Sequence, residues 1–270
     1  MVACVTAVAG AATPAVETNV FESAVPVVPE GRIDKLVLAQ LATLHLQPTL
    51  CSDAVFVRRV YLDTIGTLPT AQEAREFILD PDTRNKRRLL IDRLLAREEF
   101  ADYWAMKWGD ILRIKAEFPV NLWPNAAQAY HRWVRASIAE NKPYDQFVRE
   151  LLTSSGSNFR VGPVNFYRAI QNRTPEGVAA AVALTFMGTR AEAWSKEQLA
   201  GMAAFFSQIG YKPTHEWKEE NVFWDPLNVS AQVTNCLASD SSLPPTNCVP
   251  QVAIFPDGKQ IKLPADQDPR

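Results

Sequence analysis

The chain has 270 residues, which is enough for one large domain or two small ones. Its 28 basic and 30 acidic residues give a formal net charge of −2, which excludes a general attraction to nucleic acid or to an anionic membrane surface. Hydrophobic residues make up 47% of the chain, yet the longest apolar run, at 178–187, is about half of the roughly 20 residues that a transmembrane helix needs. We therefore expect no nucleic acid partner and no transmembrane segment.

Residues 1–31 are predicted to be a leader-like or disordered N-terminal arm. They contain no Lys or Arg, and their small apolar residues end in an Ala-rich stretch that resembles a signal-peptidase site. A complete signal peptide has a basic first segment and a longer apolar one. Two interpretations follow: a leader whose first residues are missing, or a disordered Ala/Val/Pro arm. The first of these predicts a periplasmic or otherwise exported protein.

The four cysteines do not form a C-x-x-C pair, which argues against a zinc ribbon, a thioredoxin-type site and a c-type haem attachment site. Cys236 and Cys248 flank a polar, Pro-containing loop and could form a disulfide in an exported protein. The alternative is two unpaired thiols in a loose tail.

Helix signals begin after the arm. Apolar residues at 33–47 fall on one stripe at helical spacing, and a second apolar pattern at 53–65 ends at Gly66, a typical helix terminator. Thr70 and Glu73 then form a capping box, in which two side chains satisfy free amides at a helix start. The stripe of the first helix consists of Ile33, Leu36, Val37, Leu41 and Leu44.

A basic cluster lies at the start of the next predicted helix, at 85–96. The prediction places its leucines inward and the cluster outward. Four cations in five positions could bind phosphate, but the neighbouring acidic residues favour an ordinary solvated face. The cluster consists of Arg84, Lys86, Arg87 and Arg88.

The most strongly patterned helix is predicted at 98–115. Its aromatic and aliphatic residues recur at steps of three and four, which favours a packed core face; a carbohydrate platform or a cofactor wall would use the same pattern. Charged residues flank its two tryptophans, and an oppositely charged pair four residues apart precedes it, a spacing that suits a surface ion pair. The candidate surface or pocket residues are Arg59, Asp63, Trp104, Trp108, Asp110 and Arg113.

Further helix starts and stops follow. Thr174 before Pro175 is a strong start signal, and it opens an apolar helix that Gly188 is expected to end. Ser195 and Gln198 form a second capping box.

The predicted fold class is mainly α: a multi-helix orthogonal bundle at 32–210 with an irregular C-terminal extension at 211–270. The extension is rich in Pro, Asn and Ser and ends in a β-hairpin at 251–264, where apolar residues alternate on both sides of a Pro-Asp-Gly turn. An isolated hairpin is marginal in water. It must therefore lean on the helical body or on a C-terminal domain missing from this chain.

Several segments together resemble a known family. They are FVRRVYLDTIGTLPT at 56–70, LIDRLLAREEFADYWAMKWGDILR at 90–113, NKPYDQFVRELL at 141–152, NFYRA at 165–169 and FPDGKQIKLP at 255–264. Across most of residues 32–264 the chain resembles the planctomycete and verrucomicrobial cytochrome-associated family, domain-of-unknown-function family 1549. The resemblance implies an exported protein that often follows a cytochrome c-like domain and precedes a second domain of unknown function.

One departure from the family bears on a cofactor. Many members carry a C-x-x-C-H segment after the apolar helix, which would attach haem c through two thioethers and an axial histidine. Here the interval between Gly188 and Ser195 reads Thr-Arg-Ala-Glu-Ala-Trp, with no Cys and no His. We therefore expect this chain to bind no cofactor, haem included.

The residues alone do not specify a reaction. The leading hypothesis is a non-catalytic helical module of an exported assembly that contacts a protein or a glycan. The first alternative is an electron-transfer component whose haem is held by a partner, and the second is a carbohydrate-active hydrolase that uses acids such as Asp63, Asp110 or Glu219. His215, together with Glu219, Glu220 and a third glutamate, makes either a weak metal site or a plain acidic turn.

Overall fold

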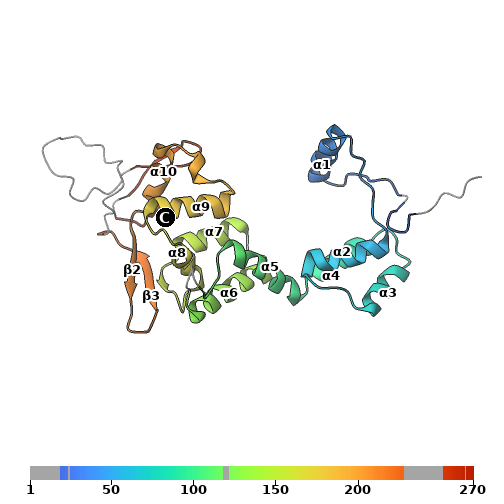
Figure 1. Cartoon of the computed structure of the whole chain (residues 1–270), viewed down its shortest axis with the longest axis horizontal. Coiled ribbons are helices and arrows are strands. Elements are labelled where there is room, and N and C mark those ends of the chain that lie inside the picture. The colour runs from blue at the N-terminus through green and yellow to red at the C-terminus, as the bar shows by residue number, and fades with distance from the viewer. Residues whose placement is uncertain (1–18, 24, 118–121, 228–251, 265) are drawn as a thin grey trace, which may run out of the picture. The chain divides into compact units, whose positions relative to one another are not determined.

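The computed structural model describes residues 19–23, 25–117, 122–227, 252–264 and 266–270. Ten α-helices and a few short antiparallel strands lie in these ranges, which confirms the prediction of a mainly α fold (Figure 1). The chain divides into two compact units, Met1–Leu95 and Ala96–Arg270, each with buried apolar residues of its own.

Local signals place the helices of the first unit. Gly66 ends its second helix in the left-handed conformation at φ 72°. At the start of the third helix, the Glu73 N–H donates to Thr70 Oγ1 (3.2 Å) and the Thr70 N–H donates to a Glu73 carboxylate oxygen (2.7 Å), which confirms the capping box. The described helices of this unit are α1 (Arg32–Thr43), α2 (Asp53–Ile65), α3 (Ala71–Leu79) and α4 (Lys86–Leu95).

The core of the first unit lies between α2, α3 and α4. Tyr61 and Ile65 of α2, Phe77 of α3, and Leu90 and Leu94 of α4 are buried. Figure 1 shows α2 and α4 side by side, and the two helices contact each other. Full burial of a large apolar side chain contributes about 1.5–3 kcal/mol, so packing rather than helix propensity dominates the stability of these short helices.

The basic cluster at the start of α4 is only partly a solvated face. Lys86 is 4% exposed, and its ammonium group forms an ion pair with Asp53 at the start of α2 (2.7 Å). Arg87 binds the same carboxylate, with Nη2 2.8 Å from Oδ1. Because Lys86, Leu90 and Leu94 are spaced four apart, they share the inward side of α4. The prediction that Lys86 points outward is therefore wrong.

The apolar stripe of α1 lies at the surface. Ile33 is 76% exposed and Leu36 64%, and no residue of this helix is buried. The Asp34 carboxylate accepts the backbone N–H groups of Glu30 (3.0 Å) and Gly31 (2.9 Å) at the start of α1. Local capping, rather than packing within the described residues, therefore defines this helix.

The second unit has a larger apolar core. Tyr130, Leu151 and Tyr167, from three different helices, are each 0% exposed within it. The described elements in chain order are α5 (Glu98–Ile111), α6 (Pro124–Ala139), α7 (Tyr144–Thr153), β1 (Gly156–Ser157), η1 (Gly162–Val164), α8 (Asn165–Ala169), α9 (Pro175–Met187), η2 (Ala191–Ala193), α10 (Lys196–Ala203), η3 (Ala204–Phe206), β2 (Ile209–Pro213), β3 (Glu220–Trp224), β4 (Val252–Ile254) and β5 (Gln260–Lys262).

The helix α9 begins and ends as its sequence predicts. Thr174 Oγ1 accepts the Gly177 N–H (3.1 Å), Pro175 stands at the first position, and Gly188 ends the helix at φ 63°. One side of α9 is buried in the core, whereas Leu184 on another side is 42% exposed. The helix is therefore not surrounded by protein along its whole length.

Three strands that sequence analysis missed belong to the second unit. β2 pairs antiparallel with β3, from Ile209 opposite Trp224 to Pro213 opposite Glu220, and β3 also pairs with β1, so that the sheet order is β1-β3-β2. Figure 1 shows β2 and β3 as neighbouring arrows. Val222 of β3 is 0% exposed and joins the helical core. Part of the segment after residue 210 is therefore regular and packed.

The C-terminal hairpin is present, and it rests on the helical body. β4 pairs antiparallel with β5, and Gly258 in the turn has φ 86°. Ala253 is buried against Ala204 of η3, and the ring centroids of Phe205 and Phe255 are 5.0 Å apart. Of the two supports that the sequence allowed, the helical body is the one that the described residues show.

Candidate functional site

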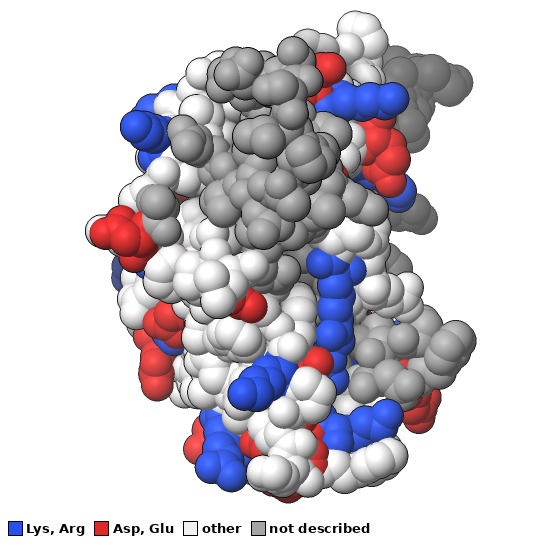
Figure 2. All heavy atoms as spheres, turned by 90° about the vertical axis from the view of Figure 1, so that its left-hand side faces the viewer, with Lys and Arg blue, Asp and Glu red and all other residues white. Residues whose placement is uncertain are grey.

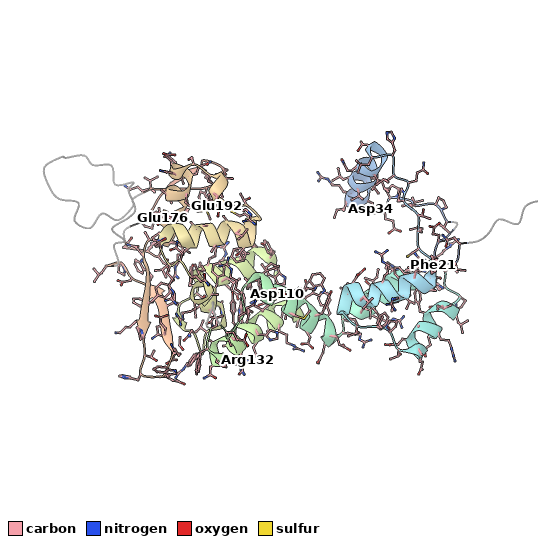
Figure 3. All side chains as sticks on the ribbon, viewed as in Figure 1. Phe21, Asp34, Asp110, Arg132, Glu176 and Glu192 are labelled. Atoms are coloured by element: carbon pink, nitrogen blue, oxygen red, sulfur yellow. The ribbon has the colours of Figure 1, made fainter. Side chains whose placement is uncertain are left out.

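The six candidate residues are divided between the two units. Arg59 and Asp63 are exposed on α2, in the first unit. In the second unit, Asp110 is exposed on α5 and is labelled in Figure 3. The candidates of the second unit are Trp104, Trp108, Asp110 and Arg113.

The tryptophans of α5 do not form its most buried face. Ala101 and Ala105 are 3% and 0% exposed, whereas Trp104 is 37% exposed, so the prediction of a buried aromatic stripe is wrong for Trp104. Helices α5 and α6 pack closely, and small side chains at the contact, including Ala126 of α6, allow that approach. Trp108 packs at the edge of the core, with its ring centroid 5.2 Å from that of Phe147.

A cavity of about 290 Å³ lies at the C-terminal end of α5, beside α9. Four segments of the second unit form its wall: the segment after α5, the turn before α9, one side of α9, and the segment that contains η2. We call it the α9 pocket. Its charged and amide lining is Arg113, Gln171, Asn172, Arg190 and Glu192, and its apolar lining includes Ile170, Ala181 and Leu184.

Two local features hold the wall of the α9 pocket. Arg113 has a left-handed backbone at φ 59°, and it follows the last turn of α5, where the Ile114 N–H donates to the Gly109 carbonyl (2.8 Å). On the opposite wall, a Cβ added at Gly177 would lie 2.3 Å from the Asn172 carbonyl oxygen. Only glycine therefore lets the turn at Asn172 approach α9 this closely.

The segment with η2 is also anchored. Ala191 is 6% exposed, and the Trp194 N–H donates to its carbonyl (3.0 Å). This burial fixes the backbone between Arg190 and Glu192, whose side chains are exposed (Figure 3 labels Glu192). The pocket therefore combines a fixed backbone with charged groups that solvent can reach.

The charges of the α9 pocket are not neutralised within the described part of the chain. Arg113 and Arg190 form no ion pair with a described residue. Glu192 contributes the one carboxylate of the lining, so the lining carries a formal charge of +1 (two arginines minus one glutamate). Elsewhere the charges are mixed: Figure 2 shows basic and acidic side chains interspersed on one face of the molecule. An arginine-lined cavity can bind an anionic group.

The acidic residues proposed for hydrolysis or metal binding have structural partners. Glu219 is 7% exposed; hydrogen bonds from Ser157 and Thr214 lower its pKa. Glu220 pairs with Arg168 and with Arg173 Nη1, the latter at 3.3 Å. Among the described residues, no three His, Cys, Asp or Glu side chains lie close enough together to hold a metal ion.

Sequence analysis missed a polar cluster around Glu220. Tyr211 lies under the guanidinium of Arg173, whose Cζ is 4.5 Å from the ring centroid, and burial raises the pKa of Tyr211 to about 12. Burial also lowers the pKa of Arg168. The cluster joins α8 to strands far along the chain, so no local spacing could reveal it.

Cys236 and Cys248 lie outside the described residues, and their disulfide stays a prediction. Cys51, in the first unit, is a free thiol of intermediate exposure. No helix in the described ranges is long and apolar enough to cross a membrane.

The fold and the pocket define a mainly helical domain with a small polar cavity. The chain belongs to the PSCyt2 family, described as a protein of unknown function (DUF1549), whose sequence profile matches residues 32–211. No curated protein and no solved structure matches the chain.

The wall of the α9 pocket includes the interval in which the resemblance places haem-attaching residues. Covalent haem attachment needs two thiols and an axial imidazole. Residues 189–194 supply a hydroxyl, a guanidinium and a carboxylate, and neither Cys nor His. These residues do not fit a c-type haem, and the chemistry they offer is that of a polar binding site.

Proposed function

We propose that this chain is a non-catalytic binding module of an exported assembly and that it contacts a glycan or a protein partner at the α9 pocket. The observation that supports this most directly is the pair Arg113 and Arg190, which line one cavity without a described ion-pair partner. A guanidinium group is planar, always charged and well suited to a partner's anionic group. The leader-like start of the sequence supports export.

The arrangement favours binding over hydrolysis. A glycosidase needs two carboxyl groups on either side of the scissile bond, and the α9 pocket has one carboxylate, Glu192, in its lining. Glu219 is held by two hydroxyl groups and Glu220 by two arginines, so both carboxylates already serve the fold. The pocket therefore resembles a recognition site more than a reaction site.

The test is capture of a ligand by the intact chain. The purified protein is applied to a glycan array and, separately, immobilised in a periplasmic extract. A variant that carries both Arg113→Asn and Arg190→Ala serves as the control; Asn tolerates the left-handed backbone at residue 113. We expect the wild type to retain a glycan or a partner that the double variant loses. The proposal is contradicted if the wild type retains no ligand in both experiments.

Electron transfer with a haem held by a partner is the second candidate. It is favoured by one observation, that the segment at 189–194 borders a cavity where family resemblance places a haem-attaching motif. An absorption spectrum of the protein purified with its partner tests it. A haem Soret band that follows the partner supports this candidate, and its absence removes it.

A further inference from the structure

We infer that the ligand of the α9 pocket is a uronic acid unit of an acidic glycan, with its carboxylate bound by Arg113 and Arg190. The inference rests on the proposed function and names the ligand class of the same site. Three properties of the pocket support it: the sign and size of its charge, its hydrogen-bonding groups and its volume.

The charge selects an anion that carries a single negative charge. Arg113 and Arg190 each present up to five N–H donors in a planar fork, which matches the two oxygens of a carboxylate. Glu192 lies in the same lining and repels additional negative charge. A phosphate or sulfate polyanion is therefore disfavoured relative to one carboxylate.

The remaining lining suits the ring of a sugar. Gln171 and Asn172 can bond hydroxyl groups; the Asn172 carboxamide oxygen already accepts the Thr174 N–H (3.1 Å), which leaves its amide group to donate. The Glu192 carboxylate can accept a hydrogen bond from a sugar hydroxyl. The aliphatic side chains of Ile170 and Leu184 can cover the C–H face of the ring. An acidic peptide would use the arginines but would leave these groups without hydroxyl partners.

The volume fits one such unit. The cavity of about 290 Å³ is just below the range of roughly 300–1,000 Å³ that ligand pockets occupy. It is therefore suited to one monosaccharide unit, with the rest of the glycan outside.

The inference is tested by isothermal titration calorimetry of the full chain with sodium glucuronate. Glucose serves as the neutral analogue, glucose 6-phosphate as the dianion and tetraglutamate as the acidic peptide. We expect glucuronate to bind roughly 10-fold or more tightly than each of the three. Glucose lacks the carboxylate, the second charge of glucose 6-phosphate is repelled by Glu192, and tetraglutamate leaves the groups that bind hydroxyls without partners. Arg190→Ala and Arg113→Asn should each weaken glucuronate binding roughly 10-fold or more. Arg149→Ala, at an exposed arginine outside the pocket, should leave it unchanged. Far-UV circular dichroism confirms that each variant is folded.

The outcomes separate this inference from the proposed function. Glucose binding as tightly as glucuronate, glucuronate binding that survives both arginine substitutions, or no binding at millimolar concentrations overturns the inference. Tighter binding of tetraglutamate with the same arginine dependence also overturns it, because the ligand would then be a protein. If the array retains a glycan while glucuronate does not bind the pocket, the proposed function stands and the ligand assignment falls.

Discussion

At the scale of single residues, Asp53 links the start of α2 to the start of α4 through ion pairs. Its carboxylate pairs with Lys86 at 2.7 Å and with Arg87 at 2.8 Å, and Lys86 is 4% exposed. Removing one partner of such a pair leaves the other charge buried and costs more than the pair itself contributes. Lys86 also donates to the carbonyl oxygens of Phe77 (3.4 Å) and Asp80 (3.3 Å). Without the Asp53 carboxylate, these two bonds would only partly stabilise the buried ammonium group.

We therefore expect Asp53→Asn to lower the free energy of unfolding by about 1–3 kcal/mol at pH 7. Asp92→Asn is the matched control, because Asp92 is an exposed carboxylate on the neighbouring helix α4. It should change stability by less than about 0.5 kcal/mol. Urea unfolding followed by circular dichroism measures both. Equal effects of the two substitutions would show that the Asp53 cluster does not stabilise the first unit.

The same carboxylate predicts a dependence on pH. Burial acts to raise the pKa of Asp53, but hydrogen bonds and the charges of Lys86 and Arg87 lower it below its ordinary value. A depressed pKa in the folded state contributes stability that is complete above the unfolded-state value of about 3.9 and is lost as the pH falls through the folded value. The stability difference between wild type and Asp53→Asn should therefore be constant near neutral pH and shrink below about pH 4. If the stability difference between the two proteins grows on acidification, the prediction is wrong.

Single residues also show where sequence patterns succeed and fail. Thr70, Ser195 and Gly188 act through their immediate neighbours, so their capping roles were predictable and are confirmed. The face of α5 was not predictable, because Ala101 is buried and Trp104 exposed by the close approach of α6. Hydrophobicity alone predicts that the tryptophan is buried. The short distance between the two helices instead leaves room only for the alanine at their contact.

At the scale of elements, the hairpin is attached to α10 through Gly201. A Cβ added at Gly201 would lie 2.5 Å from Ile254 Cβ of β4, which is too close to be relieved by a side-chain rotation. We expect Gly201→Ala to shift the hairpin and to cost about 1–3 kcal/mol. In α5, a Cβ at Gly109 would meet its nearest atom at 4.0 Å, so Gly109→Ala should be neutral or stabilising by up to about 1 kcal/mol. Thermal unfolding compares the two; a neutral Gly201→Ala contradicts the packing.

For the helix α1 we predict little loss of stability, because its apolar stripe is exposed. Leu36 is 64% exposed although it lies on the apolar stripe, whereas Leu94 of α4 is 1% exposed. Leu36→Ala should change the free energy of unfolding by less than about 0.5 kcal/mol, and Leu94→Ala should lower it by about 2–5 kcal/mol. Urea unfolding of the two variants is the measurement. A loss for Leu36→Ala near that of Leu94→Ala would mean that the stripe is packed in the isolated chain.

The strands β1, β2 and β3 mark the limit of local patterns. β1 is two residues long, and Gly156 pairs with Val222, 66 positions along the chain. A pairing of this kind leaves no period in the sequence and is fixed only when the helical core brings both segments together. The α9 pocket was missed for the same reason: Arg113 and the lining residues of α9 stood in predicted helices, but Asn172 and Arg190 come from connecting segments. No local pattern shows that these parts of the chain meet.

At the scale of the whole molecule, each compact unit has buried apolar residues of its own. The buried residues of α2, α3 and α4 lie between residues 57 and 94, and the main core of the second unit runs from Ala105 to Val222. The sequence predicted one helical domain at 32–210. Helix signals continue without a break across residue 95, and the composition changes only after residue 210. Continuous helix signals do not reveal which helices share a core.

Residues 96–270 should therefore fold without the first unit. They retain α5 from its first residue, all residues of the main core, and all four wall segments of the α9 pocket. We expect this fragment to be helical by circular dichroism and to unfold in urea in one cooperative transition. In the full chain, Leu94→Ala should destabilise only the transition of the first unit, because Leu94 lies in the other core. A fragment without a cooperative transition, or a Leu94→Ala variant that shifts both transitions equally, would show that the two cores are energetically one.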